Sequence, residues 1–358
     1  MEINGIDLDG LAHEASAIDI PPQVKGRTVH IDADFLAYQV TAEKEDGSDN
    51  KTYEDMQHNA EVAVQTLCDL AAAEHVHLHL TPSTSNKGGR FLQAIQKPYQ
   101  GNREDKPKPR YLGIMREWLA TRYQGTLHQF CEADDGMSSS QYKAIAAGDS
   151  NLSIIASKDK DLCMVPGLHL DWDTGLITNC SDPFGSVSLV ERVSSSGTKT
   201  KKLKGYGQKF FWAQMLIGDT ADNIQGLPAV PGRVMNILKP TKVIEKAQAI
   251  LASPNSNDAQ KAKAQATLDE RGDAACGPAT AILMLDRMHD HYHAFNTIKN
   301  LYKSHGEKNG FTHHATGEPA HWGHVFASEA KLLWMRRDPH NENCVLEFLT
   351  EAAKPTVH

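Results

Sequence analysis

Thr28-Val29-His30-Ile31-Asp32 is a run of β-favouring residues that ends on a carboxylate. Two later runs of the same kind also end close to an acid: residues 126–130 before Glu132, and residues 152–156 before Asp159. If these strands are parallel, their carboxyl ends meet at one edge of a sheet. Open α/β sheets place their functional sites at that edge.

The segments between these runs are predicted to be helical, because their apolar residues recur every three to four positions. They cover residues 53–74, 109–123 and 134–147, and residues 76–80 alternate like a further strand. Alternating strands and helices predict an α/β fold with a parallel sheet covered by helices on both faces.

The pattern changes after about residue 185, where a Ser- and Lys-rich stretch predicts a hairpin or loop and the residues from 208 on are mainly helical. We therefore predict three parts. They are an N-terminal extension of residues 1–24, an α/β core of residues 25–195 and a helical domain of residues 196–358.

The composition is that of an ordinary globular protein, with 358 residues, 40% of them hydrophobic and 23% charged. No apolar run approaches the ~20 residues that a membrane helix needs, and the N-terminus has no signal-peptide pattern. The six cysteines are scattered without a CxxC pair, which indicates reduced thiols. We expect a cytoplasmic protein with no membrane partner and no organic cofactor.

Eight carboxylates carry the main chemical signal: Asp32, Glu132, Asp134, Asp135, Asp159, Asp161, Asp219 and Asp222. Clustered acids repel one another, and a fold tolerates them where cations neutralise them. No Cys or His lies at matching positions, so the ligands are all oxygen, which favours Mg²⁺ or Mn²⁺ over Zn²⁺. A carboxylate site for two such ions is typical of phosphodiester hydrolysis, so the sequence predicts an enzyme that cuts nucleic acid.

Two spacings within this set predict which acids converge. Asp159 and Asp161 would share one face if the strand before them continues. Asp219 and Asp222 would share one face of a helix.

The net charge of -8 is unusual for a nucleic-acid-binding protein, but the basic residues are concentrated. Residues 87–122 hold nine Lys or Arg against three acids, and residues 199–209 hold five Lys and no acid. Basic stretches beside an acidic pocket would hold a phosphate backbone around a metal centre. The lysines of the second stretch that we expect to bind DNA are Lys199, Lys201, Lys202 and Lys204.

Six short motifs together resemble the flap endonuclease family, within which the chain is most similar to phage 5′–3′ exonucleases and to the 5′-nuclease domain of bacterial DNA polymerase I. The resemblance covers roughly residues 27–240. The motifs are Ile31-Asp32-Ala33-Asp34, Tyr99-Gln100-Gly101-Asn102-Arg103, Glu132-Ala133-Asp134-Asp135, Ser157-Lys158-Asp159-Lys160-Asp161, Gly218-Asp219-Thr220-Ala221-Asp222-Asn223-Ile224 and Gly226-Leu227-Pro228-Ala229-Val230-Pro231-Gly232.

The resemblance implies a PIN-like nuclease core, a helical arch at about 83–123 and a helix–three-turn–helix at about 208–240. The eight acids match the metal ligands of the family, which bind two Mg²⁺ ions. Arg103 matches a residue that contacts the scissile phosphate, Arg90 a second one at the foot of the arch, and Tyr99 an aromatic on which a base stacks. Gly226, Leu227, Pro228, Val230 and Gly232 match a turn whose backbone grips duplex phosphates, often with a K⁺ ion.

The implied substrate is duplex DNA with a free 5′ end or a 5′ flap, with RNA–DNA hybrid as a further candidate, in DNA replication or recombination. The implied compartment is the cytoplasm of a bacterium or of a phage-infected host.

Two positions depart from the family pattern. Gln100 replaces a Lys that lies near the scissile phosphate in the family, and Thr81-Pro82 stands where the family has an acid after its second strand. Lys97 could take over the missing positive charge if residues 94–103 form a helical turn, although Pro98 disfavours one.

Other interpretations of the sequence explain fewer of its motifs. Two groups of histidines, His289/His291/His293 and His313/His314/His321/His324, lack the spacing of a zinc site, and His75, His77 and His79 are interpreted as surface or packed residues. A haloacid-dehalogenase-type phosphatase would use Asp32 as nucleophile but leaves the other motifs unexplained, and a PIN-type ribonuclease would lack the helical domain. A DNA-binding scaffold of the same fold, with weakened or lost catalysis, stays open as the alternative function.

Overall fold

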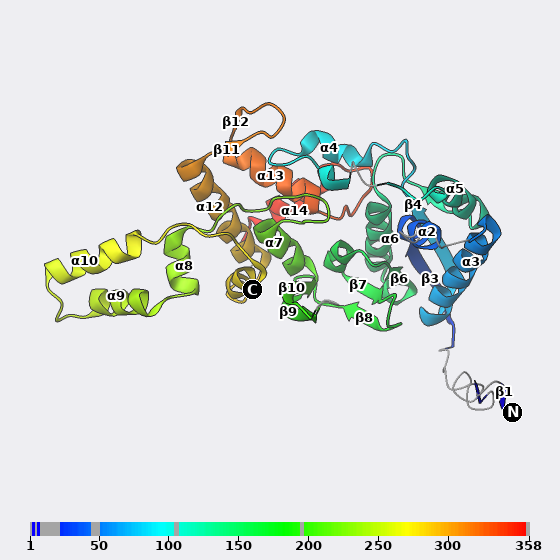
Figure 1. Ribbon diagram of the computed structural model, residues 1–358, viewed down its shortest axis with the longest axis horizontal. Coiled ribbons are helices and arrows are strands. Elements are labelled where there is room, and N and C mark those ends of the chain that lie inside the picture. Colours follow the sequence, from blue (N-terminus) through cyan, green and yellow to red (C-terminus); the bar gives the residue numbers. More distant parts are fainter. Residues whose placement is uncertain are drawn as a thin grey trace.

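A six-stranded sheet forms the centre of the first half of the chain (Figure 1). The computed structural model describes residues 2–3, 6–7, 22–43, 51–103, 107–193 and 197–355. The strand order is β5-β4-β3-β6-β7-β8. Its strands are β3 (Val24–Asp32), β4 (Ala73–Leu80), β5 (Thr126–Leu127), β6 (Ser153–Ala156), β7 (Gly167–Leu170) and β8 (Ile177–Cys180). The first five strands are parallel and β8 is antiparallel, so the predicted α/β fold with a mostly parallel sheet is confirmed.

Helices cover both faces of this sheet. The helices α2 (Ala33–Thr41), α3 (Tyr53–Leu70) and α5 (Leu112–Arg122) pack together on one face, and α6 (Ala133–Ala147) packs across β3, β4 and β6 on the other. Side chains alternate between the faces, as strand geometry requires. Ile154 and Ala156 join the core under α2, α3 and α5, whereas Ile155 joins the core that includes Met137 of α6.

The second half of the chain is mainly helical and follows a two-stranded hairpin of β9 (Ser186–Val193) and β10 (Lys199–Tyr206). Its packed helices are α7 (Gln208–Ile217), α11 (Pro278–Leu285), α12 (His291–Asn309), α13 (Trp322–Leu333) and α14 (Cys344–Ala352). Their core contains Phe211, Trp212 and Trp334, and it is continuous with Leu162 and Met164 of the first half. The two halves therefore share one hydrophobic core across the predicted boundary.

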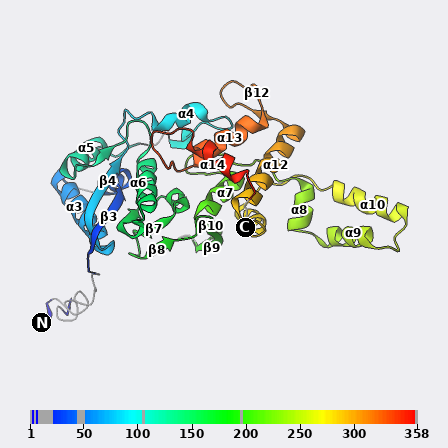
Figure 2. The ribbon, with the colours of Figure 1, turned by 180° about the vertical axis from the view of Figure 1, so that it is seen from behind.

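Three helices project from this body as an arm at the end opposite the sheet (Figures 1 and 2). They are α8 (Gly232–Leu238), α9 (Lys242–Ala252) and α10 (Asp258–Asp269), and α9 packs along α10.

Short elements complete the chain. They are β1 (Glu2–Ile3) paired with β2 (Ile6–Asp7), β11 (Phe311–Thr312) paired with β12 (Pro319–Ala320), helix α4 (Arg90–Gln93), and the single-turn 3₁₀ segments Lys87–Gly89, Gly101–Arg103, Ser150–Leu152 and Lys160–Met164. Most of the predicted N-terminal extension lies outside the described residues.

The predicted arch segment packs on the helical half through α4, since Ser328 Oγ on α13 donates to the Gln93 carbonyl at 2.6 Å. Each of the six cysteines, all of which lie in the described ranges, is free. None of the helices that the structure describes is both long and apolar enough to cross a membrane.

Candidate metal centre

Three buried carboxylates converge at the carboxyl edge of the sheet. Oxygens of Asp161, Asp219 and Asp222 all lie within 4.8 Å of one another. The side chains of Asp161 and Asp219 are 5% and 1% exposed, and that of Asp222 is 17% exposed. Because all the donors are carboxylate oxygens, this group, called here the acidic trio, can hold a hard divalent cation.

Asp159 and Asp161 reach the centre by a different route from the one predicted. The strand ends at Ala156, so the two acids do not share a strand face. Asp159 instead caps the 3₁₀ turn Lys160–Met164, and its Oδ1 accepts a hydrogen bond of 2.8 Å from the Asp161 backbone N–H. The tight turn brings both carboxylates to the same edge.

The prediction that Asp219 and Asp222 share a helix face is wrong. Helix α7 ends at Ile217, and both acids lie in a closed loop in which Asp219 and Ile224 exchange two backbone hydrogen bonds of 2.9 and 2.7 Å. Gly218 and Gly226 have φ angles of +71° and +66°, and a Cβ on Gly226 would lie 2.3 Å from the nitrogen of Gly218. Glycines at both ends therefore let the loop close and turn its carboxylates inward.

Lys160 neutralises part of the trio from within. Its Nζ lies 2.8 Å from Asp161 Oδ1 and 2.5 Å from Asp219 Oδ2, while half of the side chain remains exposed. Burial works against the charged form of Asp219, but Lys160 and the hydrogen bonds from Asp161 and the Ala221 N–H together outweigh it and hold the pKa of this carboxyl below its usual range. The sequence carried a signal for this contact, because Lys160 stands between two of the predicted ligands.

Asp32, Asp134 and Asp159 form a second buried group beside the trio. Burial, followed by the charges of Asp34 and Asp159, raises the pKa of Asp32 to about 7. Burial and then Asp159 raise the pKa of Asp134 well above its usual value, and burial raises that of Asp159. Asp134 Oδ1 has no hydrogen-bond partner among the described residues. These acids carry uncompensated charge that a bound cation would relieve.

Glu132 and Asp135 are held by an arginine rather than left open. Arg90 is 1% exposed and donates to Asp135 Oδ1 and Oδ2 at 2.9 Å each and to Glu132 Oε2 at 2.7 Å. Burial alone would raise the pKa of Asp135, but the charges of Arg90 and Arg336 and the hydrogen bonds that they donate together outweigh it and hold that pKa below the usual range. The predicted contact of Arg90 with a phosphate stays a prediction, and in this structure its Nη1 and Nη2 groups donate inside the protein.

Trp334 and Arg336 complete the set of contacts around Arg90 and Asp135. The Trp334 carbonyl accepts from Arg90 at 3.1 Å, and the Arg336 backbone N–H donates to Asp135 Oδ1 at 3.0 Å. No sequence motif announces these contacts, because the partners lie 244 and 201 positions apart.

Tyr99 and Gln100 line the trio from the predicted arch. The Tyr99 ring is 3% exposed, and its hydroxyl donates to Glu132 Oε2 at 2.8 Å and to Asp222 Oδ2 at 3.3 Å. Gln100 Nε2 donates to Asp222 Oδ1 at 3.1 Å. In this arrangement the Tyr99 ring has no open face for a base, and its stacking role stays a prediction.

The lysine that lies next to the Gln100 side chain is Lys87, not the predicted Lys97. Its Nζ donates to Gln100 Oε1 at 2.8 Å and lies 3.8 Å from Glu132 Oε1. Lys97 is exposed and lies near enough to Glu329 to lower the pKa of that carboxyl. Arg103 is half exposed and contacts Asp222 Oδ1 at 2.6 Å through its Nη2.

Thr81, which stands where the family has an acid, links two parts of the site. Its backbone N–H donates to Asp34 Oδ2 at 2.9 Å, and its Oγ1 accepts from the Ala133 N–H at the start of α6 at 2.9 Å.

The predicted duplex-gripping turn of residues 226–232 runs from the acidic loop to α8. The Gly226 N–H donates to the buried carboxylate of Glu329 at 2.8 Å, and the Gly232 N–H donates to Asp273 Oδ1 at 3.2 Å. A Cβ on Gly232 would lie 1.8 Å from the Arg271 carbonyl oxygen, so the turn requires glycine there. Leu227 and Val230 are buried and Pro228 is half-buried. The lysines at 199, 201, 202 and 204 are all exposed on β10.

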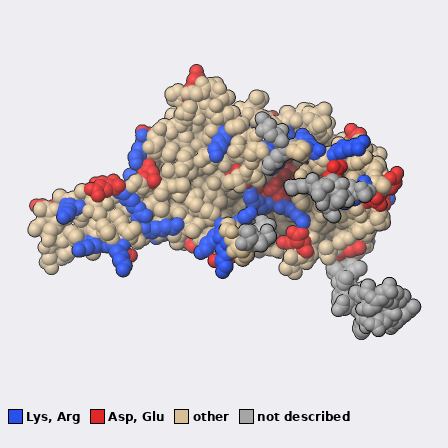
Figure 3. All heavy atoms as spheres, viewed as in Figure 1, with Lys and Arg blue, Asp and Glu red and all other residues tan. Residues whose placement is uncertain are grey.

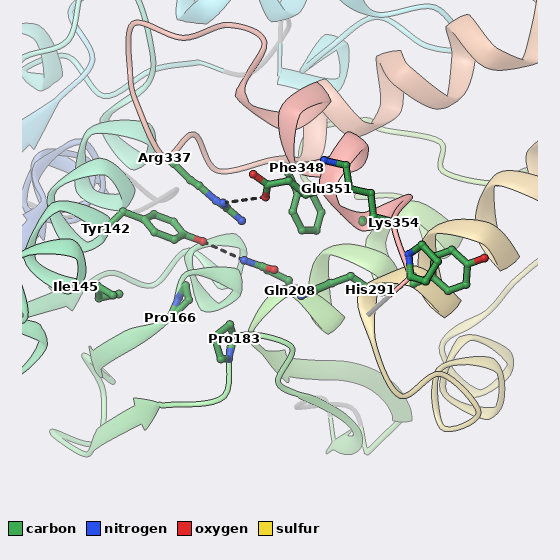
Figure 4. Close-up of a pocket in the computed structure, with 13 residues that line it drawn as sticks. Tyr142, Ile145, Pro166, Pro183, Gln208, His291, Arg337, Phe348, Glu351 and Lys354 are labelled. Carbon is green, nitrogen blue, oxygen red and sulfur yellow. Dashed lines mark hydrogen bonds and ion pairs between the residues drawn. The ribbon is translucent and has the colours of Figure 1, made fainter. Parts of the chain in front are cut away.

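In the space-filling view, an acidic area lies near the middle of the drawn face, and Lys and Arg side chains border it (Figure 3). A separate hollow of about 490 Å³ lies among α6, α7, α12 and α14. There Gln208 faces Tyr142 and Arg337 faces Glu351, as Figure 4 shows. None of the eight predicted acids is among its lining residues in the described part of the chain, so it is distinct from the acidic trio.

No protein-family model and no curated protein matches this chain. Among solved structures, it is similar to the bacteriophage T5 protein crystallised with metal ions, at a TM-score of 0.39 and 14% identity over 86% of this chain and 99% of that chain. It is also similar to the bacteriophage T5 flap endonuclease in a pseudo-enzyme–product complex with DNA and metal ions, at a TM-score of 0.40 and 12% identity over the same shares of the two chains. The resemblance is distant, and the function of this chain has to follow from its own side chains.

Proposed function

We propose that this chain is a metal-dependent nuclease that hydrolyses phosphodiester bonds in DNA with a free 5′ end or a 5′ flap, with RNA–DNA hybrid as a further substrate. The observation that carries the proposal is the acidic trio, a buried, oxygen-only group whose atoms lie within 4.8 Å of one another. Such a group costs free energy unless a cation compensates it.

Two hard divalent ions would use both groups of acids. Asp161, Asp219 and Asp222 would hold one ion, and Asp32, Asp134 and Asp159 would supply oxygens to a second. Burial, and then the charge of Asp159, raises the pKa of Asp161 well above its usual value, as it does for Asp134. Bound Mg²⁺, or Mn²⁺ in its place, would supply an acidified water and neutralise charge on the phosphate.

The chain's own cations would hold the phosphate against this centre. Lys160 and Arg103 are half exposed and now contact the trio, so each can turn toward a phosphate oxygen. Lys87 adds positive charge beside Gln100.

Contacts farther along the substrate would not depend on its sequence. The exposed lysines of β10 and the turn of residues 226–232, with a K⁺ ion at that turn, would bind the duplex backbone. Residues 83–123 would form the arch around the 5′ end, with Tyr99 stacking on a base, and residues 208–240 the helix–three-turn–helix.

Cleavage of blunt duplex, 5′-flap and RNA–DNA hybrid substrates, with Mg²⁺, Mn²⁺, Ca²⁺ or EDTA, tests the proposal. We expect Mg²⁺ and Mn²⁺ to support cleavage and Ca²⁺ and EDTA to abolish it. Asp161→Asn should lower the rate by more than about a hundredfold, because it removes a direct ligand charge, whereas loss of an outer partner already costs 10–100-fold. Asp173→Asn is the matched control, because that carboxylate is 73% exposed. Full cleavage in EDTA, or by Asp161→Asn, would refute the metal mechanism.

A DNA-binding scaffold is the second candidate, and the internal ion pairs favour it. Arg90, Lys160 and Arg103 already form ion pairs with five of the eight acids, and their three positive charges offset part of the negative charge without a metal ion. A scaffold would bind flap DNA equally well in EDTA and Mg²⁺ and would not cut it in Mn²⁺, so the same experiment separates the two functions.

A further inference from the structure

Four histidines from three adjacent strands gather on the face of the sheet that α6 covers. His30 comes from β3, His77 and His79 from β4, and His128 follows β5 directly. The register pairs His30 with His77 and Asp32 with His79 across β3 and β4. Because residues two apart on a strand share a face, the alternating histidines of β4 meet His30 on one side of the sheet.

The rings form a connected group rather than a set of separate side chains. His30 Nδ1 lies 3.0 Å from His79 Nε2, and His79 Nδ1 lies 3.0 Å from His128 Nε2. His77 stacks on His79 with ring centroids 4.5 Å apart, and its Nε2 lies 2.7 Å from Thr126 Oγ1. The interpretation of His77 and His79 as surface or packed residues is therefore incomplete, because it does not include the strand pairing that adds His30.

The nitrogen positions suit one tetrahedral ion. Ring nitrogens of His30, His77 and His79 all lie within 4.8 Å of one another. Two nitrogens bound to the same zinc ion at 2.0–2.1 Å stand about 3.3 Å apart, close to the 3.0 Å between His30 and His79. On binding, the proton that these two nitrogens now share would move to the other nitrogen of one ring. His128 would then accept from His79 Nδ1–H and orient that ring from behind.

The surroundings keep these rings neutral and open on one side. His79 is 2% exposed and His30 is 7% exposed, and burial lowers the pKa of His30 to about 3 and that of His79 well below its usual value. Neutral imidazoles bind a metal without first losing a proton from a charged form. His77, His79 and His128 also line a hollow of about 430 Å³, through which an ion can reach them.

Helix α6 leaves room for the rings only because residue 136 is glycine. A Cβ at Gly136 would lie 2.2 Å from His128 Cε1 and 2.9 Å from His79 Nδ1. The backbone of α6 therefore closes directly over the histidines at Gly136, the residue that follows Asp134 and Asp135 of the acidic centre.

We propose that His30, His77 and His79 form a site for a divalent transition metal of the zinc class, which joins β3 to β4 behind the acidic centre. Three imidazoles suit Zn²⁺, Co²⁺, Ni²⁺ or Cu²⁺, whereas the oxygen-only trio suits Mg²⁺. The two sites thus select different ions. The histidine site does not depend on the nuclease function.

Titration of EDTA-treated, desalted protein with Zn²⁺, in excess Mg²⁺ to fill the acidic centre, tests the site. We expect one tight equivalent of Zn²⁺ and, with Co²⁺ as the probe, the visible absorption of a tetrahedral ion. At a hundredfold excess over Kd, Zn²⁺ should raise Tm by about 5 °C.

The decisive variant is His77→Gln, at a half-buried position where the exchange is tolerated. It should weaken Zn²⁺ binding by more than about tenfold, cut the Tm shift by at least about half and abolish the Co²⁺ absorption. His75→Gln is the matched control, because His75 lies on the same strand with a side chain that is 60% exposed and outside the group. Asp161→Asn should keep full Zn²⁺ binding. Wild-type affinity in His77→Gln, loss of binding in Asp161→Asn, or no Zn²⁺ binding by the wild type would overturn the proposal.

Discussion

Two neighbouring pairs of carboxylates in the acidic centre are held by different kinds of cation. Arg90 holds Glu132 and Asp135 with a side chain that is 1% exposed and makes three hydrogen bonds to them. Lys160 holds Asp161 and Asp219 with a single ammonium group on a side chain that is 51% exposed. Arginine presents a rigid fork, whereas lysine is a flexible point charge.

The difference indicates which acids an incoming ion can use. Lys160 can swing into solvent and leave two carboxylates to an incoming ion, because half of its side chain is already exposed. The Arg90 side chain cannot move into solvent in this way, because its movement would leave the buried Asp135 carboxylate without its cation. We therefore expect the trio to bind the ion first, and Glu132 and Asp135 to serve as a fixed wall of the site.

The strongest way to break this comparison is to remove Arg90. Arg90→Met should destabilise the fold by about 3–5 kcal/mol, because it leaves Asp135 buried and unpaired. Urea unfolding measures the loss, and Arg110→Met, at an exposed position, is the control. Adding Asp135→Asn should restore part of the stability. A loss below about 1 kcal/mol would show that Arg90 is as dispensable as a surface cation.

Glu329 sharpens the comparison, because among the described residues no cation forms an ion pair with this buried carboxyl, and a proton takes the place of a cation. Burial raises its pKa to about 7, against an ordinary value of 4.5. The folded state then binds the proton more tightly than the unfolded state, so its contribution to stability is lost as pH rises from about 4.5 to 7.

Glu329→Gln should therefore stabilise the protein at pH 8 by about 3 kcal/mol, and this advantage should vanish as pH falls toward 4.5. The amide oxygen can still accept from the Gly226 N–H. Urea unfolding at several pH values measures the effect, with the exposed Glu318→Gln as control. An advantage that is constant with pH would mean that Glu329 is ionised in the folded state.

Substitution of Lys87, in the 3₁₀ segment Lys87–Gly89, tests whether the positive charge beside Gln100 speeds cleavage. Lys87→Gln should slow single-turnover cleavage by about tenfold, equivalent to ~1.4 kcal/mol of transition-state stabilisation. Lys97→Gln, the exposed counterpart, should change the rate little, and Gln100→Lys should add little to the charge already present. A severe loss in Lys97→Gln with none in Lys87→Gln would reverse this assignment.

Removing Lys160 should have the smallest effect. Lys160→Met eliminates a cation that competes for the oxygens of Asp161 and Asp219, so Mg²⁺ affinity measured by calorimetry should rise by up to about fivefold. Lys158→Met is the neighbouring control, since Lys158 pairs with the exposed Asp173 instead. Weaker Mg²⁺ binding in Lys160→Met would show that the trio is not where the ion binds.

The sequence predicted the sheet because its signals are local. The run before Asp32 and the alternation in β4 each specify a strand without help from distant residues. The convergence of Asp32, Asp134 and Asp159 follows from parallel pairing, which the alternation of strands and helices already implies.

The details that sequence reasoning missed depend on turns and on distant packing. The spacing of Asp219 and Asp222 predicts a helix, whereas the structure has a loop there. Gly218, at the start of the loop, is a signal against the helix, because glycine commonly ends helices. Lys87 reaches Gln100 from 13 positions away, and Trp334 reaches Arg90 from 244. The histidine group had a signal in the alternation of His77 and His79, but adding His30 requires the register of β3 against β4.

Because Trp334 and Arg336 contact Arg90 and Asp135, the acidic centre depends on residues that are translated long after most of its acids. A ribosome delivers the strands that carry Asp32 and Asp159 long before it delivers residue 334. Until then Arg90 lacks its carbonyl partner, and Asp135 lacks the amide that fixes one of its oxygens. The wall of the acidic centre, formed by Glu132 and Asp135, is therefore complete only after residues 334–336 have been translated. A chain that stops short of Trp334 would carry all eight acids and still lack the frame that positions two of them.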